Sequence, residues 1–288
     1  MRPVRVTCGP MIDLHMHTTA SDGRSTPSQL VEEVVALGIT TMAVTDHDTT
    51  AAWDEVSAAA AAAGVACLPG IEITAVDHGR DVHMLGYCFD RNYPELVTFL
   101  TTQREDRERR LREIGDRLER LGVPVDLEDA MADAARSAGR AMGRPMAAAA
   151  LVKAGHVANI KEAFDRYLGE GRPAFIERQG AEPAEVVALV TRAGGVTSMA
   201  HPGKTQKDHL IPALIEAGLP AIEVYHPEHD TADTARYRHM ADTFNLLVTG
   251  GSDYHGVGSG RSQGLGQFHL PAADFARLAE RTGWPIPV

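Results

Sequence analysis

Cysteine is scarce in this sequence, which contains only Cys8, Cys67 and Cys88 among 288 residues. Their odd number and irregular spacing argue against a disulfide framework and favour a reducing compartment. Long apolar runs are also missing, and no apolar segment led by Lys or Arg opens the chain. These absences argue against a membrane span and a secretory signal, so we expect a soluble cytoplasmic protein with no membrane partner.

Positive charge is in short supply as well. Lys and Arg number 28 against 39 Asp and Glu, which gives a formal net charge of −11. A protein that grips long stretches of nucleic-acid backbone needs a basic surface, so the composition disfavours that class. It leaves room for an anionic substrate held locally by metal ions and a few arginines. With 44% apolar residues, the chain is long enough for one large domain or two smaller ones.

Histidine, by contrast, is plentiful, with 13 residues. His15 and His17 lie at the end of the first apolar run, which begins at Met11. Side chains alternate faces along a strand, so both imidazoles point the same way and form half of a metal site. For this motif taken alone, a chance pair of histidines in a polar turn is an equally good interpretation.

Short apolar runs alternate with helical patterns at both ends of the chain. This order favours a mostly parallel sheet or a barrel in the α/β class. Strands are expected at 11–14, 39–45, 65–72, 82–89, 196–200, 221–225 and 246–249, with helices at 27–37, 50–63, 183–193, 210–217 and 232–244.

The stretch 93–172 breaks this rhythm, because helical patterns follow one another there without strands between them. Helices are expected at 103–121, 127–137, 146–154 and 160–168. We interpret the stretch as an all-helical insertion, since about 80 residues is long for an ordinary crossover between two strands.

Ionisable side chains stand at the carboxyl ends of all seven expected strands. In α/β folds, and above all in barrels, catalytic sites lie at that end. A lone buried histidine is usually structural, but coincidence at seven equivalent positions is a poor explanation. Imidazole and carboxylate without thiolate suit Mn²⁺, Zn²⁺ or Fe²⁺, and the number of donors predicts a cluster of two or three ions. The residues are His15, His17, Asp46, His47, Glu72, His83, His201, Glu223, His226, Asp253 and His255.

The ordered motifs His-x-His, Ser-Asp-Gly, Thr-Asp-His, Gly-x-Glu, His-Pro-Gly and Ser-Asp-x-His resemble those of the polymerase and histidinol phosphatase (PHP) family. The resemblance covers 1–92 and 173–288, and it implies a distorted seven-stranded (β/α) barrel into which 93–172 is inserted as an all-helical cap domain. It also implies three groups of metal ligands. These are His15, His17, Glu72 and Asp253; Glu72, as a bridge, with His83 and His201; and Asp22, His47 and His255.

Within the family, the insertion after His83 and the spacing of Glu223, Val224 and His229 resemble one subgroup. Its members are 3′,5′-nucleoside bisphosphate phosphatases, and related members degrade short RNA from the 5′ end. The resemblance implies that a metal-bound hydroxide removes the 3′-phosphate, with Mn²⁺ as the first choice of metal. The implied partners are a nucleotide phosphate and short RNA, and no obligate protein partner is evident.

Substrate contacts are expected from Arg144, Arg172 and Lys204, which can clamp phosphates, and from Glu223. Ordinary surface charge is an equally good interpretation of each basic residue. The subgroup tends to carry a histidine where this chain has Met146, and a basic residue where it has Ala149. We therefore expect the substrate contacts to depart from the subgroup's pattern.

An acid is needed to protonate the leaving 3′-oxygen. His229 is the first candidate and His226 the second, because histidine can donate a proton near pH 7. Both could instead support the ligands or contact the substrate. Asp13, Asp46 and Asp48 are expected to orient ligand histidines or to shape turns.

Three other functions stay open at this point. One is a general phosphatase for another small ester, such as a histidinol-phosphate-like compound. The second is an amidohydrolase on a related barrel, which usually needs a carboxylated lysine; no lysine closes an expected strand here. The third is a proofreading or scaffold module without activity, which the complete set of nine ligand positions disfavours.

Overall fold

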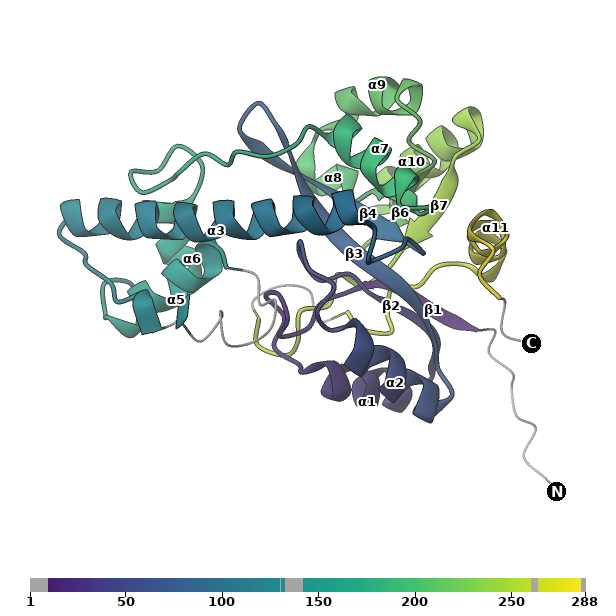
Figure 1. Ribbon diagram of the computed structural model, residues 1–288, viewed down its shortest axis with the longest axis horizontal. Coiled ribbons are helices and arrows are strands. Elements are labelled where there is room, and N and C mark those ends of the chain that lie inside the picture. The colour runs from purple at the N-terminus through teal and green to yellow at the C-terminus, as the bar shows by residue number, and fades with distance from the viewer. Residues whose placement is uncertain (1–9, 130, 133–141, 260–263, 286–288) are drawn as a thin grey trace.

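Seven strands form one sheet in the order in which they occur along the chain. The computed structural model describes residues 10–129, 131–132, 142–259 and 264–285 (Figure 1). The strands are β1 (Met11–Met16), β2 (Ile39–Val44), β3 (Ala66–Asp77), β4 (Arg80–Tyr87), β5 (Val196–Met199), β6 (Ala221–Tyr225) and β7 (Leu247–Gly250).

The sheet is mostly parallel, but β4 runs antiparallel to both of its neighbours, β3 and β5. The other four pairs, from β1 to β3 and from β5 to β7, are parallel. After β7 the chain returns to β1, where the His17 N–H donates to the Tyr254 carbonyl at 2.9 Å. The first and last strands therefore meet at one end, as in a distorted barrel, and the predicted seven-stranded α/β fold is confirmed.

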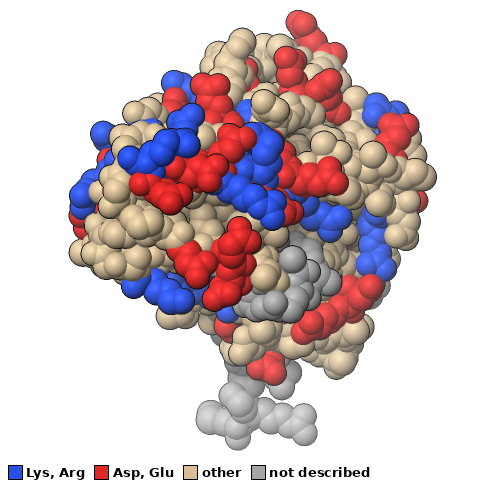
Figure 2. Space-filling view, turned by 60° about the vertical axis from the view of Figure 1, so that its left-hand side comes forward, with Lys and Arg blue, Asp and Glu red and all other residues tan. Residues whose placement is uncertain are grey.

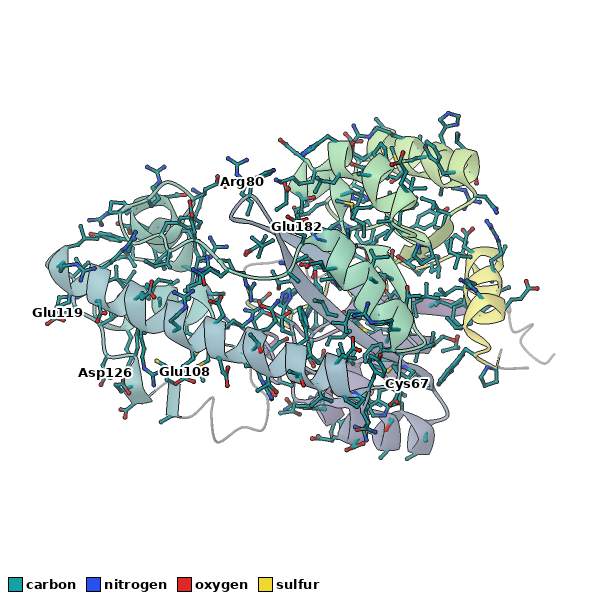
Figure 3. The ribbon with its side chains drawn as sticks, turned by 45° about the horizontal axis from the view of Figure 1, so that its top comes forward. Cys67, Arg80, Glu108, Glu119, Asp126 and Glu182 are labelled. Carbon is teal, nitrogen blue, oxygen red and sulfur yellow. The ribbon has the colours of Figure 1, made fainter. Side chains whose placement is uncertain are left out.

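One expected strand is longer than predicted. β3 continues past Glu72 to Asp77 and pairs with β4 through a tight turn at His78 and Gly79. Figure 3 shows Cys67 and Arg80 at the two ends of this hairpin. The hairpin matters for the site, because it carries Glu72 on β3 and His83 on β4, and both side chains face inward.

Helices cover both faces of the sheet (Figure 1). On one side, α1 (Pro27–Ala36) begins with the expected capping box at Thr26 and packs beside α2 (Trp53–Ala63). On the other side lie α7 (Pro183–Arg192), α9 (Ile211–Glu216) and α10 (Thr231–Phe244). Three short or terminal elements were not predicted: α8 (Pro202–Thr205), the 3₁₀ turn η2 (Asp208–Leu210) and α11 (Ala272–Thr282).

Between β4 and β5 the chain is helical, as expected. The helices are the long α3 (Pro94–Arg120), α5 (Arg144–Lys153) and α6 (Ile160–Ala163), which continues into the π-helical turn η1 (Phe164–Leu168). Leu111, Ile114, Leu118 and Leu151 bury their side chains in a hydrophobic cluster that is separate from the cores against the sheet. The expected helix 127–137 lies partly outside the described residues, and the division into a barrel and a cap domain stays a prediction.

Among the described residues, no helix combines the length and apolarity needed to cross a membrane.

Candidate metal centre

The Glu72 carboxylate lies at the centre of a group of histidines. Its side chain, halfway along β3, is fully buried. Oε2 lies near ring nitrogens of three histidines, and Oε1 lies near those of two others. The distances are 3.3 Å to His15 Nε2, 3.2 Å to His17 Nε2 and 3.3 Å to His47 Nδ1 from Oε2, and 2.7 Å to His83 Nδ1 and 3.1 Å to His201 Nε2 from Oε1. One carboxylate thus reaches ligands from four strands or strand ends.

Asp253, just after β7, completes the first group of expected ligands. Its Oδ1 lies 3.4 Å from His15 Nε2 and 3.3 Å from His17 Nε2. The backbone of Asp253 has a φ of 50°, a left-handed value that is uncommon for a residue with a side chain. This turn aims the carboxylate back toward β1.

Asp22 and two histidines form the third expected group. Asp22 Oδ1 lies 3.2 Å from His255 Nε2 and 3.7 Å from His47 Nε2. The loop that carries Asp22 is held by Asp46, whose buried carboxylate accepts hydrogen bonds from the Thr18 N–H at 2.8 Å and from the Ser21 hydroxyl at 2.5 Å. Asp46 therefore shapes the loop, as expected.

The nine residues expected as ligands are brought together at one end of the sheet. Two of the expected groups have all their candidate ligand atoms within 4.8 Å of one another, and these are the groups around Asp253 and Asp22. In the expected group of Glu72, His83 and His201, it is His47 that meets this limit with Glu72 and His83, while His201 reaches the centre through its contact with Glu72. Nδ1 of His47, Nδ1 of His83 and both ring nitrogens of His17 are buried without a hydrogen bond of good geometry to a described residue. Buried polar atoms are rarely left in this way, so the donor set fits divalent cations.

Burial and charge shift the pKa values of these groups in opposite directions. Burial lowers the pKa of His17, but Asp253 and Glu72 outweigh it and raise this pKa to about 9. At His201 burial dominates, Lys204 adds to it, and the pKa falls to about 4. Burial disfavours the charged form of Glu72, but His47 and His83 hold its pKa well below the ordinary value. Ionised carboxylates buried among imidazoles form a negatively charged site that a cation can neutralise.

Glu223 was expected to contact substrate, and the structure corrects this. Its side chain is fully buried on β6, and its two oxygens contact His15 and the backbone of His201. Although burial opposes ionisation, His15 lowers the pKa of Glu223 to about 2. The residue supports the ligands from behind and has no surface to offer to a substrate.

His229 is also placed differently from its predicted role as an acid. Its Nδ1 lies 2.9 Å from the Val224 carbonyl, and its Nε2 accepts the Gly203 N–H at 3.2 Å. Both nitrogens are thus occupied by backbone groups, which leaves no proton for a leaving group. In His226, Nδ1 accepts the Glu228 N–H at 3.1 Å, so the neutral ring carries its proton on Nε2, which lies 3.4 Å from Asp253 Oδ2. His226 stays the candidate acid.

The three predicted phosphate clamps have different positions. Arg144 lines a cavity beside the metal ligands, and its Nη2 lies 3.3 Å from Asp81 Oδ2. Lys204 lies against the ligand group, with Nζ 3.2 Å from Asp253 Oδ2 and 3.0 Å from Glu228 Oε1. Arg172 is exposed and does not line this cavity, so the structure does not bring it to the site.

Sequence reasoning missed most of the arginine cavity, which we define by Arg107, Arg110, Arg144 and Arg178. The cavity shares a wall with the metal ligands, because Asp22, His47 and His83 line it too. Arg107 and Arg110 come from α3, and Arg178 comes from the extended chain before α7. The sequence of α3 predicts an exposed, charged helix, and Arg178 belongs to no predicted element, so the sequence carried no sign that these side chains line a cavity.

Two aspartates hold three of the four arginines in place, whereas Arg110 donates from Nε to the Ile176 carbonyl at 2.8 Å. The buried Asp48, whose φ is 52°, accepts from Arg107 Nε at 2.7 Å and from Arg178 Nη2 at 3.1 Å. Asp81 pairs with Arg144. Burial, with Arg144, Arg178 and Arg107 nearby, lowers the pKa of Arg110 to about 10, although Asp81 opposes the shift. The cavity is therefore crowded with positive charge, which an anion would relieve.

On one face of the molecule the basic side chains are dispersed. On the face shown in Figure 2, the Lys and Arg residues of the described part of the chain are interspersed with Asp and Glu. A long nucleic-acid backbone would need a continuous basic path. The charge pattern of this face instead fits a compact anionic substrate.

A second cavity adjoins the arginine cavity and differs from it in chemistry. The two share Asp22, His47, Arg107, Gly143 and Pro145. The remaining wall of this apolar cavity comes from the first turns of α5 and the Asp22 loop. It consists of Met146, Ala149 and Ser21.

Comparisons with known proteins agree with this architecture. The family model of the PHP domain matches residues 13–172. A 5′-3′ exoribonuclease from Haemophilus influenzae is 36% identical over 84% of this chain and 89% of its own length. A 3′,5′-nucleoside bisphosphate phosphatase from Chromobacterium violaceum is 33% identical over 86% of this chain and 88% of its own. A phosphoribosyl 1,2-cyclic phosphate 1,2-diphosphodiesterase from Eggerthella lenta is 34% identical over 90% and 99%, respectively.

The fold has a close counterpart among solved structures. One from Bifidobacterium adolescentis, named as a metal-dependent phosphoesterase, has a TM-score of 0.86 at 35% identity and covers 95% of this chain and 97% of that one. These matches confirm the resemblance that the motifs predict.

Proposed function

Because this chain belongs to the PHP family of metal-dependent phosphoesterases, we propose that it removes the 3′-phosphate from nucleoside 3′,5′-bisphosphates. The observation that carries the proposal is the shared wall between the metal ligands and the arginine cavity. Asp22, His47 and His83 belong to both. A substrate with two phosphates can place one at the metal ligands while the other pairs with arginines.

The metal assignment follows the three ligand groups. Glu72 serves two of them, and we expect two or three ions, with Mn²⁺ first and Fe²⁺ or Zn²⁺ as alternatives. When bound, such ions acidify a water molecule that acts as the nucleophile and neutralise charge on the phosphoryl oxygens. The protein's part is to fix the donors in a buried group, so that little reorganisation is needed during the reaction.

The arginine cavity supplies binding energy away from the reacting phosphorus. Arg107 and Arg178 are held by Asp48, so their guanidinium groups are already ordered before the substrate arrives. Binding of the remote phosphate at Arg144 and its neighbours can then be used to position the scissile ester. His226, with its proton on Nε2, is our candidate donor to the leaving 3′-oxygen.

A phosphate-release assay with purified, Mn²⁺-loaded protein tests the function. The substrates are adenosine 3′,5′-bisphosphate, 3′-AMP, 5′-AMP, a phosphoribosyl 1,2-cyclic phosphate and a small ester such as histidinol phosphate. We expect kcat/KM for the bisphosphate to exceed that for either monophosphate, with 5′-AMP as the product. Equal values for 3′-AMP and the bisphosphate would overturn the proposal and indicate a general phosphatase.

Trimming of short RNA is a second candidate activity. A 5′-phosphorylated RNA presents a phosphate for the arginine cavity and a phosphodiester on the 3′ side of the same nucleotide, where the bisphosphate carries a phosphomonoester. The similarity to a 5′-3′ exoribonuclease supports this reading. Incubation with a 5′-phosphorylated pentanucleotide should release 5′-mononucleotides in order from the 5′ end, and 5′-hydroxyl RNA should react more slowly.

A further inference from the structure

We propose that Glu223 is a positioning residue that holds two metal-ligating histidines from different strands. Its Oε1 lies 2.9 Å from His15 Nδ1, and its Oε2 accepts the His201 backbone N–H at 2.7 Å. The side chain is fully buried, and each of its two oxygens makes one of these contacts. Glu223 on β6 therefore joins the end of β1 to the turn after β5. The proposal rests on the metal site of the proposed function.

The contact with His15 selects a tautomer. His15 Nε2 faces Glu72 Oε2 at 3.3 Å and Asp253 Oδ1 at 3.4 Å, on the side where a cation would bind. A neutral imidazole that offers Nε2 to a metal carries its proton on Nδ1. Glu223 Oε1 accepts that proton's hydrogen bond, and such partners orient a ligand ring and raise its basicity.

The contact with His201 holds an unfavourable backbone conformation. His201 has a φ of 28° and a ψ of 57°, which is costly for a residue with a side chain. The hydrogen bond to Glu223 and that from Gly203 to His229 fix the turn on both sides of Pro202. As a result, His201 Nε2 lies 3.1 Å from Glu72 Oε1.

A glutamine at this position could not make both contacts. An amide has one acceptor oxygen and one donor NH₂ group. If the oxygen accepts from the His201 N–H, the NH₂ group faces His15 Nδ1 and favours the tautomer with the proton on Nε2. If the amide is reversed, two donors meet at His201. Glu223→Gln thus keeps size and shape but disturbs one ligand in either orientation.

The test compares Mn²⁺ binding by the wild type, Glu223→Gln and Ser198→Ala, using titration calorimetry and metal analysis. Ser198→Ala is the matched control, because it removes a buried hydrogen bond of 2.7 Å to Thr249 between strands and touches no ligand. We expect Glu223→Gln to weaken Mn²⁺ binding about 10–100-fold, the usual effect of losing such a partner. Added Mn²⁺ should restore most of its activity, and Ser198→Ala should bind Mn²⁺ like the wild type.

Unchanged Mn²⁺ affinity in folded Glu223→Gln would overturn the proposal, whereas failure of the wild type to bind Mn²⁺ would overturn the metal centre itself. A raised KM with unchanged Mn²⁺ affinity would restore the substrate contact expected from the sequence. If Glu223→Gln does not fold, ¹⁵N NMR of the Zn²⁺-loaded wild type decides. A proton on His15 Nδ1 supports the proposal, and a bare Nδ1 overturns it.

A second inference concerns the apolar cavity. It does not depend on Glu223, but it also rests on the proposed function. We infer that the cavity takes the nucleobase of the substrate. It opens beside Asp22 and His47, and Pro145, Met146 and Ala149 give it a wall without charge. A proline ring and a methionine thioether pack well against the face of an aromatic ring. The two cavities and the metal ligands then match the two phosphates and the base of one nucleotide.

The test compares kcat/KM for adenosine 3′,5′-bisphosphate and for the base-free 1-deoxyribose 3,5-bisphosphate. We expect the wild type to prefer the nucleotide about tenfold, since the base-free substrate buries no ring against the apolar wall. Met146→Ala should reduce this preference through KM, and Met240→Ala, a partly buried methionine on α10, should keep it. Equal kcat/KM values for both substrates in the wild type would overturn this inference and leave the proposed function intact. Hydrolysis of neither would overturn the proposed function and this inference with it.

Discussion

The metal ligands and the arginine cavity lie side by side but are built in different ways. The ligands are imidazoles and carboxylates on strands or in the turns after them, and every strand of the sheet except β6 positions at least one of them. The four arginines come from α3, from α5 and from the chain before α7, and two aspartates hold three of them. The first region is fixed by strand pairing, whereas the second depends on ion pairs between separate segments. We therefore expect substitutions in the first to abolish chemistry and those in the second to change stability and affinity.

Glu72→Gln should have the largest effect on turnover. The carboxylate faces five histidines from two sides, and an amide cannot serve two ligand groups at once. We expect kcat to fall roughly 10³-fold or more, because charge stabilisation by the metal cluster is lost. Phosphate release and metal content, measured on the same preparation, check this. EDTA treatment of the wild type should give a similar loss that Mn²⁺ reverses.

A matched exposed substitution sets the baseline for that experiment. Glu162→Gln removes a carboxylate that pairs with Arg166 on the surface of α6, far from the ligand groups in the sequence. Such pairs are worth little, so activity and metal content should equal those of the wild type. If Glu72→Gln behaves like Glu162→Gln, the ligand assignment fails.

The same contrast explains what the sequence could predict. His15 and His17 alternate with core residues along the chain, and strand ends in this fold class converge, so the spacing predicted a metal cluster at this end of the sheet. The division into three ligand groups, and the place of Asp22 among them, came from the resemblance to the PHP family. Arg107 looked like one of several exposed charges on α3, because its partner Asp48 is 59 residues away in the chain. Glu223 looked like a polar site residue, and only coordinates show that it contacts His15 from behind the ligand groups. The periodicity of the sequence does not predict contacts between side chains of distant segments.

Asp48→Asn should be the most damaging change in the arginine cavity. The asparagine can still accept from the Thr74 N–H through Oδ1, but the charge that neutralises Arg107 and Arg178 is gone. Leaving buried charges unpaired costs about 3–5 kcal/mol. Urea unfolding at pH 7 measures this free energy, and a change below 1 kcal/mol would show that the arginines are not held by this carboxylate.

The pH dependence of stability sharpens this test. Burial opposes ionisation of Asp48, but Arg107 and Arg178 outweigh it and lower its pKa below the ordinary 3.8. The unfolded chain then binds the proton more readily than the folded one. The stabilisation by Asp48 is therefore complete above the unfolded pKa and is lost as pH falls through the lower folded pKa. Between pH 6 and pH 3, the difference in unfolding free energy between wild type and Asp48→Asn should shrink.

Arg144→Ala should affect affinity more than chemistry. Arg144 lines the cavity from the start of α5 and pairs with Asp81 where the side chains are partly buried. A hydrogen bond to a charged group is worth about 1.5–3 kcal/mol, so KM for the bisphosphate should rise about 10–100-fold. kcat should stay within a fewfold, because the group lies away from the reacting phosphorus. A collapse of kcat at constant KM would place Arg144 on the transition state instead.

Arg172→Ala should have the smallest effect and is the natural control for Arg144→Ala. Both residues were expected to clamp phosphate, yet Arg172 is exposed and lies outside the lining of the cavity. Its backbone N–H donates to the Gly169 carbonyl at 3.0 Å, a contact that alanine keeps. We expect KM and kcat within about twofold of the wild type, as for most exposed substitutions, which change stability by less than about 0.5 kcal/mol. If Arg172→Ala raises KM as much as Arg144→Ala does, the substrate extends beyond the cavity to this exposed position. The contrast between a partly buried, ion-paired clamp and a dispersed surface charge would then fail.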